Sequence, residues 1–159
     1  MKSIVLGIDP GTTRIGYGLI RVSGMDLSHI ESGLLPVLDT ERRPAARLWN
    51  IEQEFRKLVQ RARPDIVGIE KLFFTKNKKT AMRVAEARGV ILKTAAELGL
   101  KIEEVSPSAV KISVTGNGRA NKEAVAKMTN LMLKLPPRKV VDDVTDALAI
   151  AIAVSNTRF

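Results

Sequence analysis

Apolar residues in this chain form short β-branched runs near the N-terminus and fall into helical spacing further on. The runs at 3–9, 15–22 and about 27–37 predict three strands. Their short Gly-rich and polar connections favour an antiparallel meander. Two later apolar segments, 66–70 and 101–105, predict a fourth and a fifth strand.

Helical spacing of apolar residues marks the other segments. It predicts helices over about 45–62, 80–98, 107–113 and 142–155, together with a helix that is capped by Asn121 and ends at Leu135-Pro136. The segment 142–155 is apolar almost all round, which indicates a buried helix. Gly89 lies in the middle of a predicted helix, where it indicates close approach of another helix. Residues 115–120 predict a mobile loop.

This order of elements predicts an α/β fold. We expect a single domain over residues 1–159. Its five-stranded mixed sheet has three antiparallel strands followed by two parallel strands, and helices flank it. A right-handed crossover places the fourth strand beside the first, with the two strands parallel.

Composition narrows the class of protein. Hydrophobic residues make up 45% of the 159 residues, which is typical of a globular domain. The chain contains no cysteine, which excludes disulfides and thiolate metal sites and fits a reducing compartment. No apolar run approaches the ~20 residues that span a bilayer, and the N-terminus lacks a signal-peptide pattern. We therefore expect a cytoplasmic protein with no membrane partner.

Positive charge is concentrated in two parts of the sequence. The formal net charge is +9, and the sequence pI is about 10.1. Between Lys71 and Lys93 there are seven basic residues and one acid, and between Lys101 and Lys139 there are eight basic residues and three acids. Such an excess predicts a polyanionic partner, with nucleic acid preferred over a membrane surface.

Two acidic residues end predicted parallel strands. Asp9 precedes Pro10-Gly11, where an isolated aspartate is commonly a turn residue. Glu70 ends the fourth predicted strand and by itself could be an ordinary solvated strand end. If the two strands are neighbours, both carboxylates lie at the carboxyl edge of the sheet, where α/β sheets bind ligands.

Two more acids share a face at the start of the last predicted helix. Asp143 and Asp146 are three residues apart and could join Asp9 and Glu70 in a cluster of four carboxylates. Such a cluster favours a cation between its members, and hard oxygen ligands suit Mg²⁺ or Mn²⁺. Two such ions can clamp a phosphodiester during hydrolysis. Alternatively, Asp142 or Asp143 caps the helix, and the negative charge of Asp146 is favourable near the positive end of the helix dipole. For Asp142 the role of a cap is preferred.

Several motifs appear together with these acids and in a fixed order. They are Gly7-Ile8-Asp9-Pro10-Gly11, Gly16-Tyr17-Gly18, Ile69-Glu70, Ala87-Arg88-Gly89-Val90 and Asp143-x-x-Asp146-Ala147-Leu148-Ala149-Ile150-Ala151-Ile152. This set resembles the bacterial RuvC family of Holliday junction resolvases, within the ribonuclease H-like superfamily. The resemblance extends from the first predicted strand to the last predicted helix.

The resemblance implies an activity and its cofactor. Members are crossover junction endodeoxyribonucleases that nick two strands symmetrically at a four-way DNA junction during recombination and repair. By resemblance, Asp9, Glu70, Asp143 and Asp146 hold two Mg²⁺ ions, for which Mn²⁺ is expected to substitute. The resemblance further implies a ribonuclease H-like fold, a T-rich cleavage sequence and cooperation with the branch-migration motor RuvAB. Symmetric cutting implies a homodimer with two active sites on one substrate.

Other positions match family residues near the DNA. Lys111 and Lys122 match basic residues near the cleaved strand, although either could be an ordinary surface lysine. Phe73 matches an aromatic residue that stacks on bases, and Phe74 could stack or lie in the core. Four residues are expected to contact phosphates: Lys76, Lys78, Lys79 and Arg119.

The small residues Ala85, Gly89 and Ala96 form the expected dimer contact.

Three competing functions start from the same features. Gly-Ile-Asp-x-Gly-Thr-Thr also resembles the phosphate-binding hairpin of the sugar kinase and actin superfamily of ATPases. The chain lacks the second phosphate loop and the Gly-Gly adenosine site of those proteins, and 159 residues leave no room for their second domain. The second candidate is a catalytically silent nucleic-acid-binding module, which the four acids disfavour. The third is a related nuclease acting on another branched DNA or RNA.

Overall fold

A five-stranded mixed sheet forms the centre of the computed structural model, which describes residues 2–37, 43–72, 78–136 and 142–157. The strand order is β3-β2-β1-β4-β5. The strands are β1 (Lys2–Pro10), β2 (Ile15–Ser23), β3 (Asp26–Leu34), β4 (Ile66–Glu70) and β5 (Lys101–Val105). β1, β2 and β3 form the antiparallel meander, and β4 and β5 run parallel to β1. The predicted sheet is therefore confirmed.

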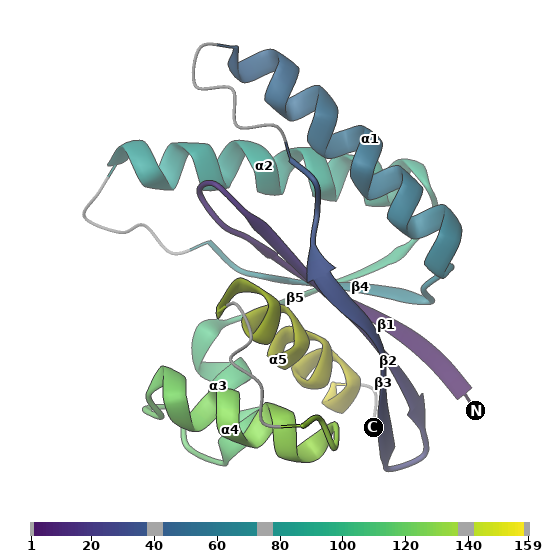
Figure 1. The fold of residues 1–159 in the computed structure, drawn as a ribbon, viewed down its shortest axis with the longest axis vertical. Helices are drawn as coiled ribbons and strands as arrows, with labels where there is room; N and C mark the ends of the chain where they lie inside the picture. Colours follow the sequence, from purple (N-terminus) through teal and green to yellow (C-terminus); the bar gives the residue numbers. More distant parts are fainter. Residues whose placement is uncertain (1, 38–42, 73–77, 137–141, 158–159) are drawn as a thin grey trace.

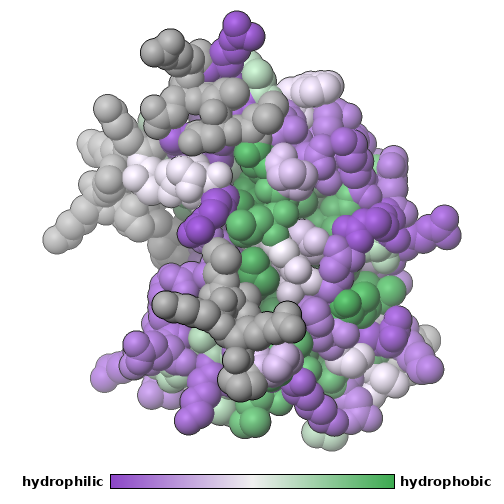
Figure 2. Space-filling model, viewed as in Figure 1, coloured by the Kyte–Doolittle hydropathy of each residue, from purple (hydrophilic) through white to green (hydrophobic). Residues whose placement is uncertain are grey.

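The helices cover the two faces of the sheet in separate layers (Figure 1). They are α1 (Pro44–Ala62), α2 (Lys78–Glu97), α3 (Pro107–Thr115), α4 (Lys122–Met132) and α5 (Asp142–Asn156). α1 and α2 lie on one side, and α5 lies on the other with α3 and α4 outside it. Seen from the same direction, the surface has apolar side chains mainly along its middle, with hydrophilic side chains around them (Figure 2). In the described parts of the chain, no helix is long and apolar enough to cross a membrane.

Each face of the sheet has its own apolar core because side chains alternate along a strand. On β1, Val5 joins the core under α5, whereas Leu6 and Ile8 join the core under α1 and α2. α5 is buried from Val144 to Ser155 except at Asp146, which is partly exposed. This pattern confirms the expectation of a buried final helix.

Two element boundaries differ from the sequence expectation. β3 ends at Leu34, not near residue 37, because Pro36 has no N–H for a strand ladder. α3 continues to Thr115, where the left-handed Gly116 closes it by donating its N–H to the carbonyl of Ile112. The expected cap of α4 is confirmed, since the Asn121 side chain accepts a hydrogen bond from the N–H of Ala124 at 2.8 Å.

Gly89 has no helix packed against it in the described chain. A Cβ atom added to Gly89 would meet no atom within 4 Å. Within the described chain, therefore, no helix makes the close approach that the sequence predicts at Gly89. The residue lies on the exposed side of α2, whose core-facing side chains are Ala87, Ile91 and Ala95.

Candidate active site

Glycines on the first two strands let α5 lie directly on the sheet. A Cβ atom at Gly7 would come within 2.0 Å of the backbone oxygen of Ala147, and one at Gly16 within 1.9 Å of the backbone oxygen of Asp143. Real Cβ atoms do not approach so closely, so only glycine permits this packing. The contact at Gly16 brings the first turn of α5 against the end of the sheet that carries Asp9 and Glu70.

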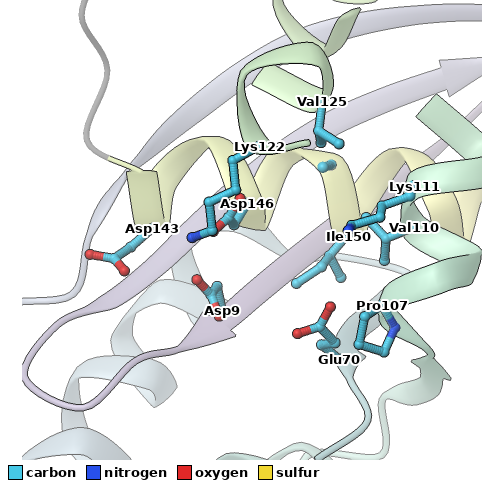
Figure 3. A pocket seen from close by; sticks show the side chains of 11 residues that line it. Asp9, Glu70, Pro107, Val110, Lys111, Lys122, Val125, Asp143, Asp146 and Ile150 are labelled. Carbon is cyan, nitrogen blue, oxygen red and sulfur yellow. The ribbon is translucent and has the colours of Figure 1, made fainter. Parts of the chain in front are cut away.

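Asp9 and Glu70 face α5 from neighbouring strands. Ile8 on β1 pairs with Ile69 on β4, and both side chains belong to the core on the opposite face. Because side chains alternate along a strand, the next residues, Asp9 and Glu70, point to the α5 side. The structure thus confirms that these two carboxylates lie near each other at the carboxyl edge of the sheet (Figure 3).

A cavity of about 380 Å³ brings all four predicted acids together. Asp143 and Asp146 line it from the first turns of α5, across from Asp9 and Glu70 (Figure 3). Lysines enter it from α3 and α4, and apolar side chains form the rest of its wall. The lining residues are Asp9, Glu70, Pro107, Val110, Lys111, Lys122, Val125, Asp143, Asp146, Ala149 and Ile150.

Burial and repulsion between charges disfavour the ionised form of Asp9, Glu70 and Asp146. Burial, followed by the charges of Asp146, Glu70 and Asp143, raises the pKa of Asp9 to about 7. Burial is also the largest cause of the raised pKa values of Glu70 and Asp146. A cluster of this kind favours bound positive charge, and its hard oxygen donors are the ligands that Mg²⁺ and Mn²⁺ prefer.

Two lysines supply part of that positive charge. The Nζ atom of Lys122 donates a hydrogen bond to Oδ2 of Asp146 at 3.4 Å, and its charge opposes the raised pKa of Asp9. Lys111 lies on α3 at the other end of the cavity, where its charge opposes the raised pKa of Glu70. Both lysines predicted for the site therefore lie in it.

Asp143 lines the cavity but is paired with a residue that the sequence analysis did not predict. The Nε atom of Arg14, in the turn between β1 and β2, lies 2.9 Å from Oδ2 of Asp143. In the described residues, no group of three or more acidic or histidine side chains is gathered closely enough to hold a metal ion in this conformation. The donor set fits a divalent cation in its chemistry, and its side chains would have to turn toward one another to bind it.

Asp142 does not share the position of its neighbour. It is the first residue of α5, is exposed and is not among the residues that line the cavity. It lies inside the first helical turn, so the expectation that it caps the helix from outside is wrong. Its negative charge still interacts favourably with the positive end of the helix dipole.

The predicted DNA contacts are only partly described. Phe73, Phe74 and Lys76 lie outside the described residues, as do the side chains of Lys78 and Lys79 at the start of α2. Arg119 is exposed in the turn that joins α3 to α4. It does not line the cavity, although the two helices that flank it do.

Comparison with known sequences identifies the family. The profile described as crossover junction endodeoxyribonuclease RuvC matches residues 5–154. A RuvC from Thermosipho melanesiensis is 43% identical over 156 residues, which cover 98% of this chain and 99% of the relative. A RuvC from Heliobacterium modesticaldum is 43% identical over 154 residues, which cover 97% of this chain and 94% of the relative.

Solved structures agree with the sequence comparison. The Thermus thermophilus RuvC structure in complex with a Holliday junction substrate has a TM-score of 0.87 and 30% identity, covering 96% of this chain and 93% of that chain. The yeast mitochondrial Holliday junction resolvase, at 14% identity and a TM-score of 0.71, shares the fold; the match covers 94% of this chain and 76% of that chain. The chain belongs to the RuvC family of crossover junction endodeoxyribonucleases, with a ribonuclease H-like fold.

Proposed function

We propose that the protein resolves four-way DNA junctions by paired symmetric nicks in recombination and repair, using the acid cavity to hydrolyse one phosphodiester bond per protomer. The observation that carries this proposal is the meeting of Asp9, Glu70, Asp143 and Asp146 in one cavity with Lys111 and Lys122. Three separate elements, β1, β4 and α5, supply the acids. A structural role for one acid does not account for the arrangement of all four.

The proposed cofactor is a pair of Mg²⁺ ions, with Mn²⁺ as a substitute. Asp9 lies between Glu70 and the Asp143–Asp146 pair (Figure 3), so it is the acid best placed to serve both ions. When bound, such ions lower the pKa of the attacking water and stabilise the leaving oxygen. The raised pKa of Asp9 supports the proposal, because a buried acid cluster with too little positive charge favours a cation.

The lysines have a separate role in this proposal. Lys122 lies beside Asp146, and Lys111 lines another part of the cavity from α3, so each can contact a phosphate oxygen of the bound strand. Fixed positive charge near the reacting phosphate stabilises the charge that develops during hydrolysis. Arg119, Lys76, Lys78 and Lys79 contact phosphates further along the DNA, and Phe73, with Phe74 as the alternative, stacks on an unpaired base.

Paired nicking requires two active sites on one junction. We propose a two-fold symmetric homodimer whose contact includes the exposed side of α2, where Ala85 is partly exposed and Gly89 and Ala96 are exposed. The open space at Gly89 supports this contact, since a partner helix could approach closely there. Cooperation with the motor RuvAB and a T-rich cleavage sequence belong to the proposal through family resemblance.

The proposal is tested with Asp146→Asn on a synthetic four-way junction and on linear duplex, in Mg²⁺ and in EDTA. We expect the variant to bind the junction as wild type does and not to cut it, because the substitution removes a ligand and spares the basic surface. Asp142→Asn is the matched control: it makes the same change one turn away, on an exposed residue that does not line the cavity. It should cut normally.

Each outcome has a distinct meaning. Normal cleavage by Asp146→Asn would overturn the acid-cavity assignment. Equal cutting of linear duplex and junction by wild type would overturn the proposed junction resolution and leave a nuclease without preference for junctions. Cleavage in EDTA would contradict the requirement for a metal ion.

A further inference from the structure

Arg88 of α2 reaches the end of β4 from the layer opposite the active-site cavity. Its Nε atom donates a hydrogen bond to the backbone carbonyl oxygen of Glu70 at 3.1 Å. Its Nη2 atom forms an ion pair with the carboxylate of Glu104 on β5. The Arg88 side chain is only 17% exposed, so burial helps to hold it in this geometry. One planar guanidinium thereby joins α2 to the ends of two neighbouring strands.

At the end of β4, the strand ladder offers the Glu70 carbonyl no N–H donor from β1. Glu70 is the last residue of the strand, and the N–H of Lys71 donates to the carbonyl of Val105 at 2.8 Å. On the other side, Pro10 follows Asp9 on β1 and has no N–H with which to extend the parallel ladder past Glu70. Arg88 supplies a donor to the Glu70 carbonyl that the neighbouring strand cannot supply.

We propose that Arg88 is a positioning residue for Glu70, which holds the last peptide of β4 so that the Glu70 carboxylate points at the other acids. The inference rests on the proposed function of the acid cavity. The Glu70 side chain rotates about bonds that begin at its backbone. The orientation of the backbone peptide therefore determines which positions the carboxylate can reach. Figure 3 shows that carboxylate directed into the cavity toward Asp9.

Arg88 acts through Glu70 and has no direct contact with the cavity. It is not among the lining residues, and Glu104 balances its charge. It is therefore not a further cation for the phosphate, unlike Lys111 and Lys122. Residues that orient a metal ligand in this way typically change metal affinity or activity by 10–100-fold when they are replaced, as a general rule for outer-shell partners.

The test compares Arg88→Met and Arg88→Lys with wild type. Direct titration with Mn²⁺ gives the metal affinity without DNA, and cleavage of a four-way junction gives the Mg²⁺ concentration for half-maximal rate. We expect Arg88→Met to lower the Mn²⁺ affinity and to raise the Mg²⁺ concentration for half-maximal rate, each by roughly tenfold or more. Junction affinity in EDTA should stay within about twofold, because Arg88 does not contact the DNA in this proposal. The metal affinity of Arg88→Lys should fall between those of wild type and Arg88→Met, since an ammonium keeps the charge and cannot reproduce the planar pair of donors of the guanidinium.

Arg56→Met is the matched control for stability. Arg56 of α1 also joins two partners, Glu52 of α1 and Glu97 of α2, and none of the three lines the cavity. Its replacement should change thermal unfolding and leave the metal dependence unchanged. If Arg56→Met weakens metal binding as much as Arg88→Met does, the effect is one of general stability and the proposal fails.

Two further outcomes are decisive. Wild-type metal affinity in both Arg88 variants overturns the positioning role, and Arg88→Lys provides that answer even if Arg88→Met does not fold. Asp146→Asn belongs in the same series. If it cuts normally, the acid-cavity proposal fails whatever the Arg88 variants do. If it is inactive while the Arg88 variants behave as wild type, only the role of Arg88 fails.

Discussion

Arg14 and Asp143 form an ion pair, 2.9 Å between Nε and Oδ2, at the mouth of the acid cavity. Arg14 comes from the turn after β1, and Asp143 from the first turn of α5. In this arrangement the Asp143 carboxylate points away from Asp9 and Asp146 (Figure 3). For Asp143 to bind a metal ion together with those acids, its side chain has to leave Arg14.

Replacement of Arg14 should therefore make metal binding easier. We expect Arg14→Gln to lower the Mg²⁺ concentration for half-maximal cleavage by about two- to fivefold, because the exposed Arg14 side chain is screened by solvent and such an ion pair contributes at most ~1 kcal/mol. Arg21→Gln, which makes the same change at an exposed position on β2, should leave that concentration unchanged. A higher Mg²⁺ requirement in Arg14→Gln would show that Arg14 assists the site and does not compete for Asp143.

Metal binding should depend on pH through Asp9. Its pKa of about 7 in the folded, metal-free protein means that Asp9 holds a proton at pH 6 and has largely lost it by pH 8.5. A divalent cation binds the carboxylate, so metal affinity should rise with pH through 7 and binding at pH 6 should release about one proton. Calorimetric titration with Mn²⁺ in two buffers of different ionisation enthalpy measures that number. Zero proton release at pH 6 would contradict this assignment.

The same shift affects the stability of the metal-free protein. The folded-state pKa of Asp9 is raised above its ordinary value of 3.8, so its contribution to the free energy of unfolding is most favourable at low pH and falls as pH rises from about 4 through 7. Asp9→Asn removes this titration. In urea unfolding of the two metal-free proteins, the stability of wild type relative to Asp9→Asn should fall between pH 4 and pH 8, and a constant difference would argue against a raised pKa.

The packing of α5 on glycine should be essential for the position of the acids. A Cβ atom at Gly16 would lie 1.9 Å from the backbone oxygen of Asp143, so Gly16→Ala must move the start of α5 away from the sheet. We expect a loss of about 1–3 kcal/mol in the free energy of unfolding, together with loss of cleavage. Gly118→Ala is the control: its Cβ would lie 3.3 Å from the flexible Ile112 side chain and 3.8 Å from the backbone oxygen of Ser108, so its cost should be small.

The proposed dimer contact predicts a change in oligomeric state. Gly89 is exposed, and nothing in the described chain would obstruct a side chain there. Gly89→Arg should therefore fold as wild type does and sediment as a monomer at micromolar concentration, where wild type sediments as a dimer. Gln60→Arg adds the same charge at an exposed position on α1 and should remain dimeric. A wild-type monomer, with or without junction DNA, would contradict the proposed contact.

The sequence was sufficient to predict the sheet and the four acids of the cavity. Strand alternation and the handedness of crossovers are local or topological rules, so they placed Asp9 and Glu70 on adjacent strands without coordinates. The glycines at positions 7 and 16 were visible as motif residues, but the reason for them, direct contact with the backbone of α5, appears only in the structure. No helix of the described chain approaches Gly89, and the sequence could not show this, because no local pattern shows what packs on an exposed helix face.

The sequence by itself determined the elements, their order and the residue types of the site, because each depends on spacing along the chain. Only the tertiary structure revealed the pairing of Arg14 with Asp143 and of Arg88 with the Glu70 carbonyl. A long arginine side chain can reach many partners, and its choice depends on which distant elements fold beside it and on which acceptors remain unbonded there. That choice is set by packing in three dimensions, which neither periodicity nor charge encodes.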